Sequence, residues 1–113
     1  MAEPAEACVV LVTLGSEEAA DVLATTLVEE RLAACGNIVP GVRSIYRWQG
    51  AVQRDTEVLL LLKTVSARVP ALSARIRELH SYDVPEVLAL PVLGGLQAYL
   101  EWIEESTNLA EGK

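Results

Sequence analysis

The sequence contains no phenylalanine and a single histidine among its 113 residues. Apolar residues make up 51% of the chain and aromatic residues 4%, so aliphatic side chains must fill most of the core. No run of about 18 apolar residues occurs, which excludes a transmembrane helix. The acidic start, M-A-E-P-A-E-A, lacks the basic region of a signal peptide. We therefore expect a cytoplasmic protein without a membrane partner.

Basic residues are also scarce. The chain has 9 Lys and Arg against 16 Asp and Glu, which gives a net charge of −7 and a pI of about 4.6. Nucleic-acid binding needs clustered Lys and Arg to neutralise phosphates, so we expect no nucleic-acid partner. Most of the carboxylates are expected to form a solvated surface, because Asp and Glu are usually exposed.

The motifs of structural zinc sites and of common hydrolases are absent. The two cysteines, Cys8 and Cys35, are not in a C-x-x-C spacing, and we expect both to be free thiols. There is no G-x-S-x-G motif, and the glycine pair at 94–95 lacks the pattern of a phosphate loop. We therefore expect no enzymatic activity and no organic cofactor.

The length of the chain suits one domain, residues 1–113, with a core over about 8–105. Hydrophobic patterns and chain breakers predict the order β-α-β-β-α-β followed by a further helix, which is the ferredoxin-like α+β arrangement. The first predicted elements are a strand over 8–14 and a helix that begins at residue 17 and ends at Gly36. A hairpin follows, with a first arm over 37–48 and a second arm that ends at residue 64. The last predicted elements are a helix over 66–79, a strand over 87–92 and a helix over 96–103. We expect the first strand and the stretch 57–64 to be buried on both faces.

The predicted hairpin is unusually long, with arms of roughly 12 residues against a usual length near 5 or 6. Arms of that length overhang a domain of this size and leave unpaired backbone groups, so they favour contact with another chain. Pro40 cannot donate a ladder hydrogen bond and is expected at an edge or a bulge. Tyr46 and Trp48 share one face of the arm, and we expect Pro40, Tyr46 and Trp48 in a subunit interface.

The stretch H-S-Y-D-V-P-E, residues 80–86, has two interpretations. It is either a helix end followed by a turn, in which Asp83 forms the turn and Pro85 prevents the helix from continuing, or a binding site. An imidazole and carboxylates are both metal ligands and acid–base groups. We take His80, Glu86 and, at a distance in sequence, Cys35 as candidate metal ligands.

Four further residues are candidates for lining a ligand cleft. Lys63 ends a strand of leucines, and Glu57 lies six residues before it on the same face, so the two could form an ion pair or line a polar pocket. Trp48 suits the aromatic wall of a cleft as well as it suits an interface. With Tyr82 from the candidate loop, the predicted cleft set is Trp48, Glu57, Lys63 and Tyr82.

Four blocks in this order resemble the CutA family of divalent-cation tolerance proteins: R-L-A-A-C-G-N-I-V-P-G-V-R-S-I-Y-R-W-Q-G, E-V-L-L-L-L-K-T, H-S-Y-D-V-P-E-V and G-G-L-Q-A-Y-L-E-W-I. The resemblance covers about residues 8–105. It implies a ferredoxin-like protomer, a homotrimer closed through strand edges and similar to the PII signalling proteins, and a link to divalent metals, copper above all. The chain departs from the family pattern at Ala51, where a lysine is usual, and at Val12 and Leu79, where some members have a cysteine and a second histidine.

Three hypotheses of function remain, of which an enzyme of unknown reaction ranks last. The first is a trimeric metal-response protein that binds copper or another divalent cation weakly, because one imidazole and scattered carboxylates do not form a preset cage. The second is a PII-like trimer that binds a small anionic metabolite between subunits, with Lys63, Trp48 and Tyr82 as contacts.

Overall fold

The computed structural model describes residues 6–109 and has the predicted order of elements. The terminal residues of the predicted domain, 1–5 and 110–113, lie outside the described residues. The elements are β1 (Ala7–Leu14), α1 (Glu17–Glu29), β2 (Cys35–Trp48), β3 (Ala51–Val65), a 3₁₀ turn (Ser66–Arg68), α2 (Val69–Leu79), β4 (Leu88–Pro91) and α3 (Gln97–Ser106).

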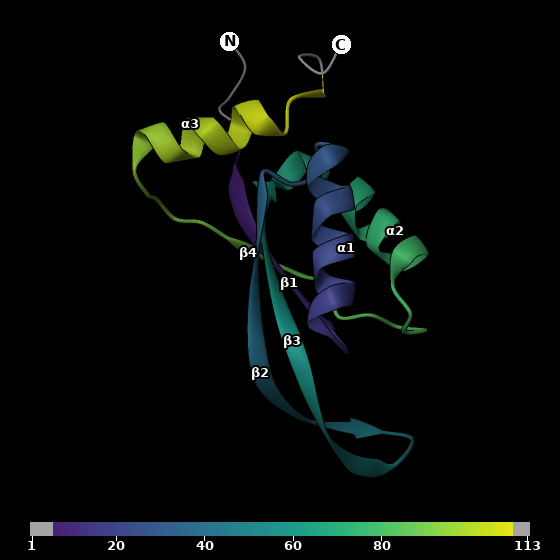
Figure 1. Cartoon of the computed structure of the whole chain (residues 1–113). Helices are drawn as coiled ribbons and strands as arrows, with labels where there is room; N and C mark the ends of the chain where they lie inside the picture. The colour runs from purple at the N-terminus through teal and green to yellow at the C-terminus, as the bar shows by residue number, and fades with distance from the viewer. Residues whose placement is uncertain (1–5, 110–113) are drawn as a thin grey trace.

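The four strands form one antiparallel sheet in the order β2-β3-β1-β4. Helices α1 and α2 cover one face of the sheet, and α3 lies at the end away from the hairpin turn (Figure 1). This is the α+β ferredoxin-like topology that the sequence predicted. Along β1 and β3 the alternate side chains that face α1 and α2 are fully buried, with Val10, Val12, Leu60 and Leu62 at 0% exposure. Leu27, Leu72 and Ile76 close the core from the helices.

The predicted end of the first helix is wrong. Helix α1 begins after Ser16, whose hydroxyl accepts the amide of Ala19, but it ends at Glu29 rather than at Gly36. Arg31 takes a left-handed conformation (φ 60°), and the amide of Leu32 bonds the carbonyl of Leu27, which is the hydrogen-bond pattern of a Schellman end.

Gly36 instead belongs to strand β2 and serves close packing. A Cβ atom there would lie 3.1 Å from the Cβ of Ala24 and 3.2–3.3 Å from methyl groups of Leu60 and Leu62. The glycine therefore lets α1 approach the sheet closely.

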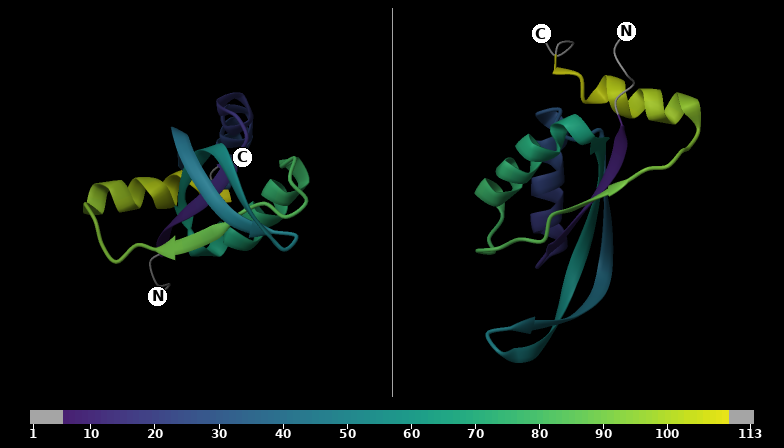
Figure 2. Two further views of the ribbon diagram at one scale, coloured as in Figure 1. Left: turned by 90° about the horizontal axis from the view of Figure 1, so that it is seen from below. Right: turned by 180° about the vertical axis from the view of Figure 1, so that it is seen from behind.

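The hairpin of β2 and β3 is longer than expected, with arms of 14 and 15 residues. It projects beyond the helices (Figures 1 and 2), and the molecule measures 51 × 29 × 22 Å. As predicted, Pro40 lies in an irregularity of the ladder, between Val39 and Val42, where Gly41 adopts a φ of 76°. Gly50 (φ 80°) completes the turn at the tip.

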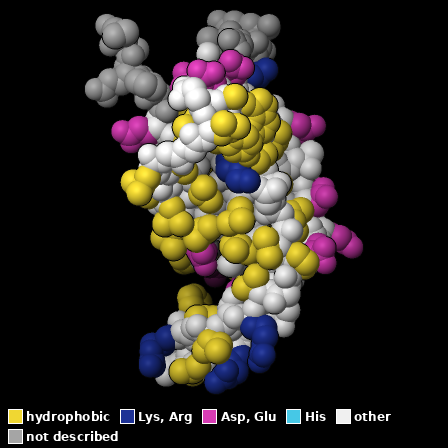
Figure 3. Space-filling view, turned by 90° about the vertical axis from the view of Figure 1, so that its left-hand side faces the viewer, with side chains coloured by type: hydrophobic (Ala, Val, Ile, Leu, Met, Phe, Trp, Pro, Cys, Tyr) yellow, Lys and Arg dark blue, Asp and Glu magenta, His cyan; other side chains and the backbone are white. Residues whose placement is uncertain are grey.

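The second face of the sheet is more exposed than predicted. Val9, Leu11, Leu59 and Leu61 point away from α1 and α2 and are only half-buried in the single chain. On the edge strand β4, Leu88 and Leu90 extend this surface with 56% and 47% exposure. Figure 3 shows hydrophobic side chains gathered on this side of the molecule, with Lys and Arg at the hairpin end. We call this surface, made of these six residues, the open face.

Helix α3 packs across one end of the sheet. Ile103 is buried against Ala34 and Val65, and Arg68 donates a hydrogen bond of 2.8 Å to the carbonyl of Thr107. Within residues 6–109, the chain has no helix with the length and apolar character needed to cross a membrane.

Candidate functional site

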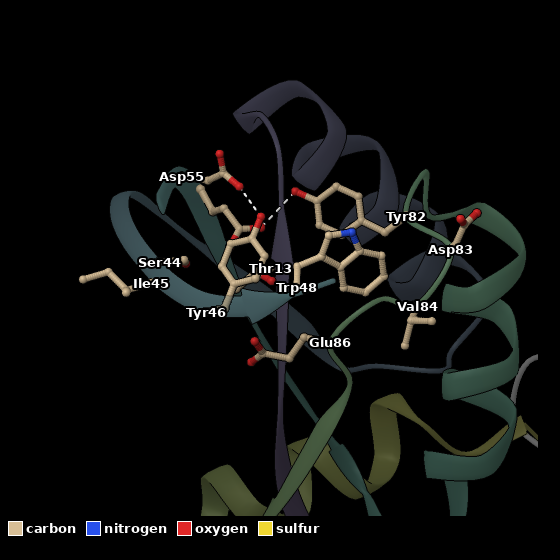
Figure 4. Close-up of a pocket in the computed structure, with 11 residues that line it drawn as sticks. Thr13, Ser44, Ile45, Tyr46, Trp48, Asp55, Tyr82, Asp83, Val84 and Glu86 are labelled. Carbon is tan, nitrogen blue, oxygen red and sulfur yellow. Dashed lines mark hydrogen bonds between the residues drawn. The ribbon is translucent and has the colours of Figure 1, made fainter. Parts of the chain in front are cut away.

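A cleft of about 580 Å³ lies where the hairpin meets the loop that follows α2 (Figure 4). Its walls are formed by the end of β1, by both arms of the hairpin and by the loop. Its lining residues are Thr13, Ser44, Ile45, Tyr46, Trp48, Asp55, Glu57, Tyr82, Asp83, Val84 and Glu86.

Strand register explains the hairpin wall of the cleft. Ser44 pairs with Asp55, and Tyr46 pairs with Gln53, so alternate residues of the two arms share one face. Glu57 follows Asp55 on that face at the base of the hairpin, and Trp48 follows Tyr46 toward the tip. The alternation therefore places two carboxylates and two aromatic rings on the same side of a two-stranded ribbon.

Two tyrosines hold two of the carboxylates. The hydroxyl of Tyr82 donates a hydrogen bond of 2.9 Å to Oε2 of Glu57, and the hydroxyl of Tyr46 donates to Oδ2 of Asp55. Burial, reinforced by the bond to Glu57, raises the pKa of Tyr82 to about 12. The bond to Asp55 raises the pKa of Tyr46. Both phenols therefore stay neutral donors at physiological pH.

His80 supports the cleft from behind and is not among the lining residues. It ends α2 and is only 9% exposed. Its Nδ1 accepts the amide of Tyr82 at 3.1 Å, and its Nε2 lies 2.8 Å from the carbonyl of Thr13. Because Nδ1 acts as an acceptor, the proton is assigned to Nε2, which donates to Thr13. Both ring nitrogens are therefore occupied by bonds within the chain, and metal ligation would have to break one of them.

Cys35 and Lys63 lie far from this cleft. They pair with each other in the β2–β3 ladder, six residues along β3 from Glu57, which is about 20 Å of extended strand. Lys63 donates to Oδ1 of Asn37 at 2.5 Å, and Sγ of Cys35 is 3.8 Å from the hydroxyl of Tyr99 on α3. Within one chain, the predicted set of His80, Glu86 and Cys35 is not brought together, and Lys63 does not face Glu57 across the cleft.

The other predicted cleft residues do converge. Trp48, Glu57, Tyr82 and Glu86 line one cavity, and Tyr46, which was assigned to an interface, joins them. Sequence reasoning missed Asp55 and favoured a turn role for Asp83 over a place in the site. For Asp55 a signal was present, because it alternates with Glu57 on one strand; for Asp83 no signal separated a turn from a site.

The donor set does not match a preformed metal centre. Among residues 6–109, no group of three or more His, Cys, Asp and Glu side chains is placed to hold a metal ion. Four carboxylates line the cleft, those of Asp55, Glu57, Asp83 and Glu86, and no Lys, Arg or His side chain of the described residues does so. The arrangement can attract cations, through oxygen ligands spread over the cleft, and it opposes anions.

Comparison with known proteins places this arrangement in a family. The family described as CutA1 divalent ion tolerance protein matches residues 8–106. The chain is 57% identical over 100 residues to the divalent-cation tolerance protein CutA of Thermus thermophilus. The aligned region covers 88% of this chain and 97% of that protein. The chain is 44% identical over 105 residues to human protein CutA, covering 93% of this chain but only 59% of the human protein.

Solved structures agree with the sequence comparison. The divalent cation tolerance protein of Thermus thermophilus superposes with a TM-score of 0.88 at 55% identity, covering 90% of this chain and 99% of that one. CutA1 from Oryza sativa superposes with a TM-score of 0.90 at 48% identity, covering 93% and 96%. On the family match over residues 8–106, the identity to these relatives and the superposed structures, the chain belongs to the CutA1 divalent ion tolerance family.

Proposed function

We propose that this protein acts in divalent-cation tolerance as a homotrimer without enzymatic activity, and that it binds divalent cations weakly through the carboxylates of the cleft. The observation that supports the proposal is the set of four acidic side chains lining one cavity, with no basic residue among the described residues that line it. Scattered carboxylates give modest affinity, since water must complete the coordination of the ion.

The donor atoms favour a cation that accepts oxygen ligands over one that requires nitrogen or sulfur. Carboxylate oxygens suit Mg²⁺, Ca²⁺ and Mn²⁺, whereas copper prefers imidazole or thiolate. His80 uses both ring nitrogens within the chain, and Cys35 lies at the other end of the sheet. We therefore propose little selectivity for copper. The alternative of an anionic metabolite gains no support from this cleft, because Lys63 points elsewhere.

A trimer is supported by surfaces that a single chain leaves uncovered. The open face exposes Leu88 and Leu90, and β2 and β4 are unpaired edges of the sheet. Pro40, Tyr46 and Trp48 are exposed on the projecting hairpin, where we propose contacts with a neighbouring subunit. A closed ring would cover edges and apolar surface that otherwise promote aggregation. Light scattering at micromolar concentration should give three times the chain mass, and a monomer would contradict this proposal.

The proposed compartment is the cytoplasm. Cys8 and Cys35 are both free thiols, which agrees with a reducing environment. Relatives are named for other locations, including a chloroplastic protein of Arabidopsis thaliana and a periplasmic protein of Archaeoglobus fulgidus, so the compartment needs a direct measurement by fractionation.

Calorimetric titration with Mn²⁺ and Cu²⁺ tests the cation proposal. A double variant, Glu57→Gln with Glu86→Gln, should lose most Mn²⁺ binding, because it removes two cleft charges with little change in volume. His80→Ala should weaken Cu²⁺ binding no more than Mn²⁺ binding. Undiminished affinity in the double variant would place the cation site outside the cleft.

A further inference from the structure

The face of the hairpin opposite the cleft carries three arginines. Strand alternation turns Arg43 and Arg47 of β2 away from Tyr46, which lines the cleft. Arg54 of β3 pairs with Ile45, so it lies diagonally across from both other arginines, at the roughly 7–8 Å that separates such neighbours. We call Arg43, Arg47 and Arg54 the arginine cluster. Figure 3 shows the basic side chains at the hairpin end around hydrophobic ones.

Nothing in the described part of the chain balances the charges of this cluster. The three side chains are exposed, and within residues 6–109 none of them makes a hydrogen bond or an ion pair. The nearest acid in sequence, Asp55, accepts a hydrogen bond from Tyr46 on the cleft face. Like charges on neighbouring strands repel one another, and a bound anion would relieve that repulsion.

A small hollow of about 150 Å³ lies within the cluster. It is smaller than the roughly 300–1,000 Å³ of sites for drug-sized ligands, so it suits one compact group. Thr56 pairs with Arg43, which puts its hydroxyl on the same face. The hollow therefore offers the guanidinium groups of Arg43 and Arg54 and one hydroxyl. Its full lining is Arg43, Ser44, Ile45, Arg54, Asp55 and Thr56.

These donors favour a phosphoryl group. A guanidinium presents two parallel N–H donors that match two oxygens of a phosphate, and the hydroxyl of Thr56 donates a further hydrogen bond. Arg47 does not line the hollow and lies four residues along β2 from Arg43, which is about 13 Å of strand. A ligand that meets all three arginines therefore needs a second anionic group joined to the first.

The surroundings limit the size of the ligand. The whole chain has a net charge of −7, so the part outside the three positive charges of the arginine cluster carries −10. A long polyanion or an extended anionic surface would meet that charge as well, whereas a short anion contacts only the hairpin end. The subunit contacts proposed for Tyr46 and Trp48 use the opposite face of the ribbon and therefore leave the cluster open to a ligand.

We propose that the arginine cluster binds a short linear oligophosphate, free or carried by a nucleotide, with one phosphoryl group in the hollow between Arg43 and Arg54 and the next reaching toward Arg47. The inference goes beyond divalent-cation binding and does not require it, because the ligand has the opposite charge and uses the other face of the hairpin. It also differs from a metabolite site built on Lys63, Trp48 and Tyr82, since none of these residues takes part.

Calorimetric titration of the full chain tests the proposal, in buffer with EDTA so that no metal ion bridges the anion to the cleft. Tripolyphosphate should bind saturably, more tightly than pyrophosphate and about tenfold or more above orthophosphate. Binding of ATP at least as tight as tripolyphosphate would identify a nucleotide, and weaker binding of ATP would identify a free oligophosphate. Absence of saturable binding at millimolar anion, or equal affinity for orthophosphate and tripolyphosphate, would overturn the proposal.

Variants assign the binding to individual arginines. Arg54→Gln should weaken tripolyphosphate binding about tenfold or more, the effect of losing charge-assisted hydrogen bonds to the central arginine. Arg54→Lys should weaken it by a smaller factor, because lysine keeps the charge but lacks the planar fork. Arg47→Gln should weaken the binding of tripolyphosphate more than that of pyrophosphate, since the longer anion extends farther from the hollow. Equal affinities in wild type and Arg54→Gln would refute the site.

Arg31→Gln removes the same charge at the other end of the sheet and is the matched control. Arg31 comes just before Ala34, whose amide bonds the carbonyl of Lys63, and Lys63 is about 30 Å of strand from Arg54. The control should stay within about twofold of the wild type, because a distant charge is screened. An equal loss in both variants would mean general attraction and would refute the site.

Light scattering on the same variants separates a ligand contact from a subunit contact. The mass of the assembly should be the same for wild type and for every variant of the arginine cluster. If Arg54→Gln lost the anion only together with its assembly, the cluster would be part of a subunit contact and the proposal would be wrong.

Discussion

Replacing His80 with alanine should destabilise the protein substantially, although the sequence marked this residue only as a helix end or a candidate metal ligand. The imidazole is 9% exposed and makes two hydrogen bonds, to the carbonyl of Thr13 at 2.8 Å and to the amide of Tyr82 at 3.1 Å. Its ring also lies 4.5 Å from the ring of Tyr82, centroid to centroid. The variant would lose all three contacts at once.

The expected loss follows from those contacts. Each hydrogen bond contributes about 1 kcal/mol, and the contact between rings about 0.5–1 kcal/mol. We therefore expect the free energy of unfolding to fall by about 2–3 kcal/mol. Because Tyr82 would no longer be held by its own amide, the bond from its hydroxyl to Glu57 should weaken, and cation binding in the cleft should fall as a secondary effect.

Urea denaturation at a fixed chain concentration measures this change, since association would make the midpoint depend on concentration. Ser81→Ala is the matched control, because Ser81 is the exposed neighbour and should change stability by less than about 0.5 kcal/mol. If His80→Ala were as stable as Ser81→Ala, the two hydrogen bonds would not hold the loop and the account of the cleft wall would be wrong.

Three further perturbations test other parts of the structure. The pKa of Tyr82 is raised from 10.0 to about 12 in the folded chain, so its contribution to stability is present below pH 10 and is lost as the pH rises through 12. Tyr82→Phe should therefore remove the most alkaline step from a tyrosinate absorbance titration. An unchanged titration curve would contradict the assignment. Gly36→Val should lower the free energy of unfolding, measured with denaturant, by about 1–3 kcal/mol, because its Cβ would meet Ala24 and Leu60. An unchanged free energy of unfolding would mean that α1 can move away from the sheet without loss of stability. Without reductant, a thiol reagent should count two reactive groups per denatured chain, and a count of zero would refute free Cys8 and Cys35.

Local sequence signals predicted most of the fold because the chain marks its own boundaries. Pro40 marks the bulge, and Pro91 ends the edge strand β4. The end of α1 was missed for a physical reason. The residue in left-handed conformation is Arg31, not the glycine that usually takes this role, and Gly36 is present for packing instead.

The site was predictable where it depends on strand alternation and unpredictable where it depends on tertiary contacts. Strand alternation groups Tyr46 with Trp48 on one arm, and on the other arm it would also have grouped Asp55 with Glu57. The burial of His80 could not be read from the sequence, since its Nε2 bonds the carbonyl of Thr13, 67 residues earlier. Lys63 lies away from the cleft because six residues of extended strand separate it from Glu57.

The most direct test of the account is where a divalent cation binds. Mn²⁺ is paramagnetic and prefers oxygen ligands, so it broadens the NMR signals of amides close to its site. Added stepwise to the isotope-labelled protein, it should broaden the amides of Glu57, Tyr82 and Glu86 first, and the Glu57→Gln, Glu86→Gln double variant should lose this effect. Broadening that begins instead at Cys35 and Tyr99, or that spreads evenly over the acidic surface, would contradict the claim that the cleft is the cation site.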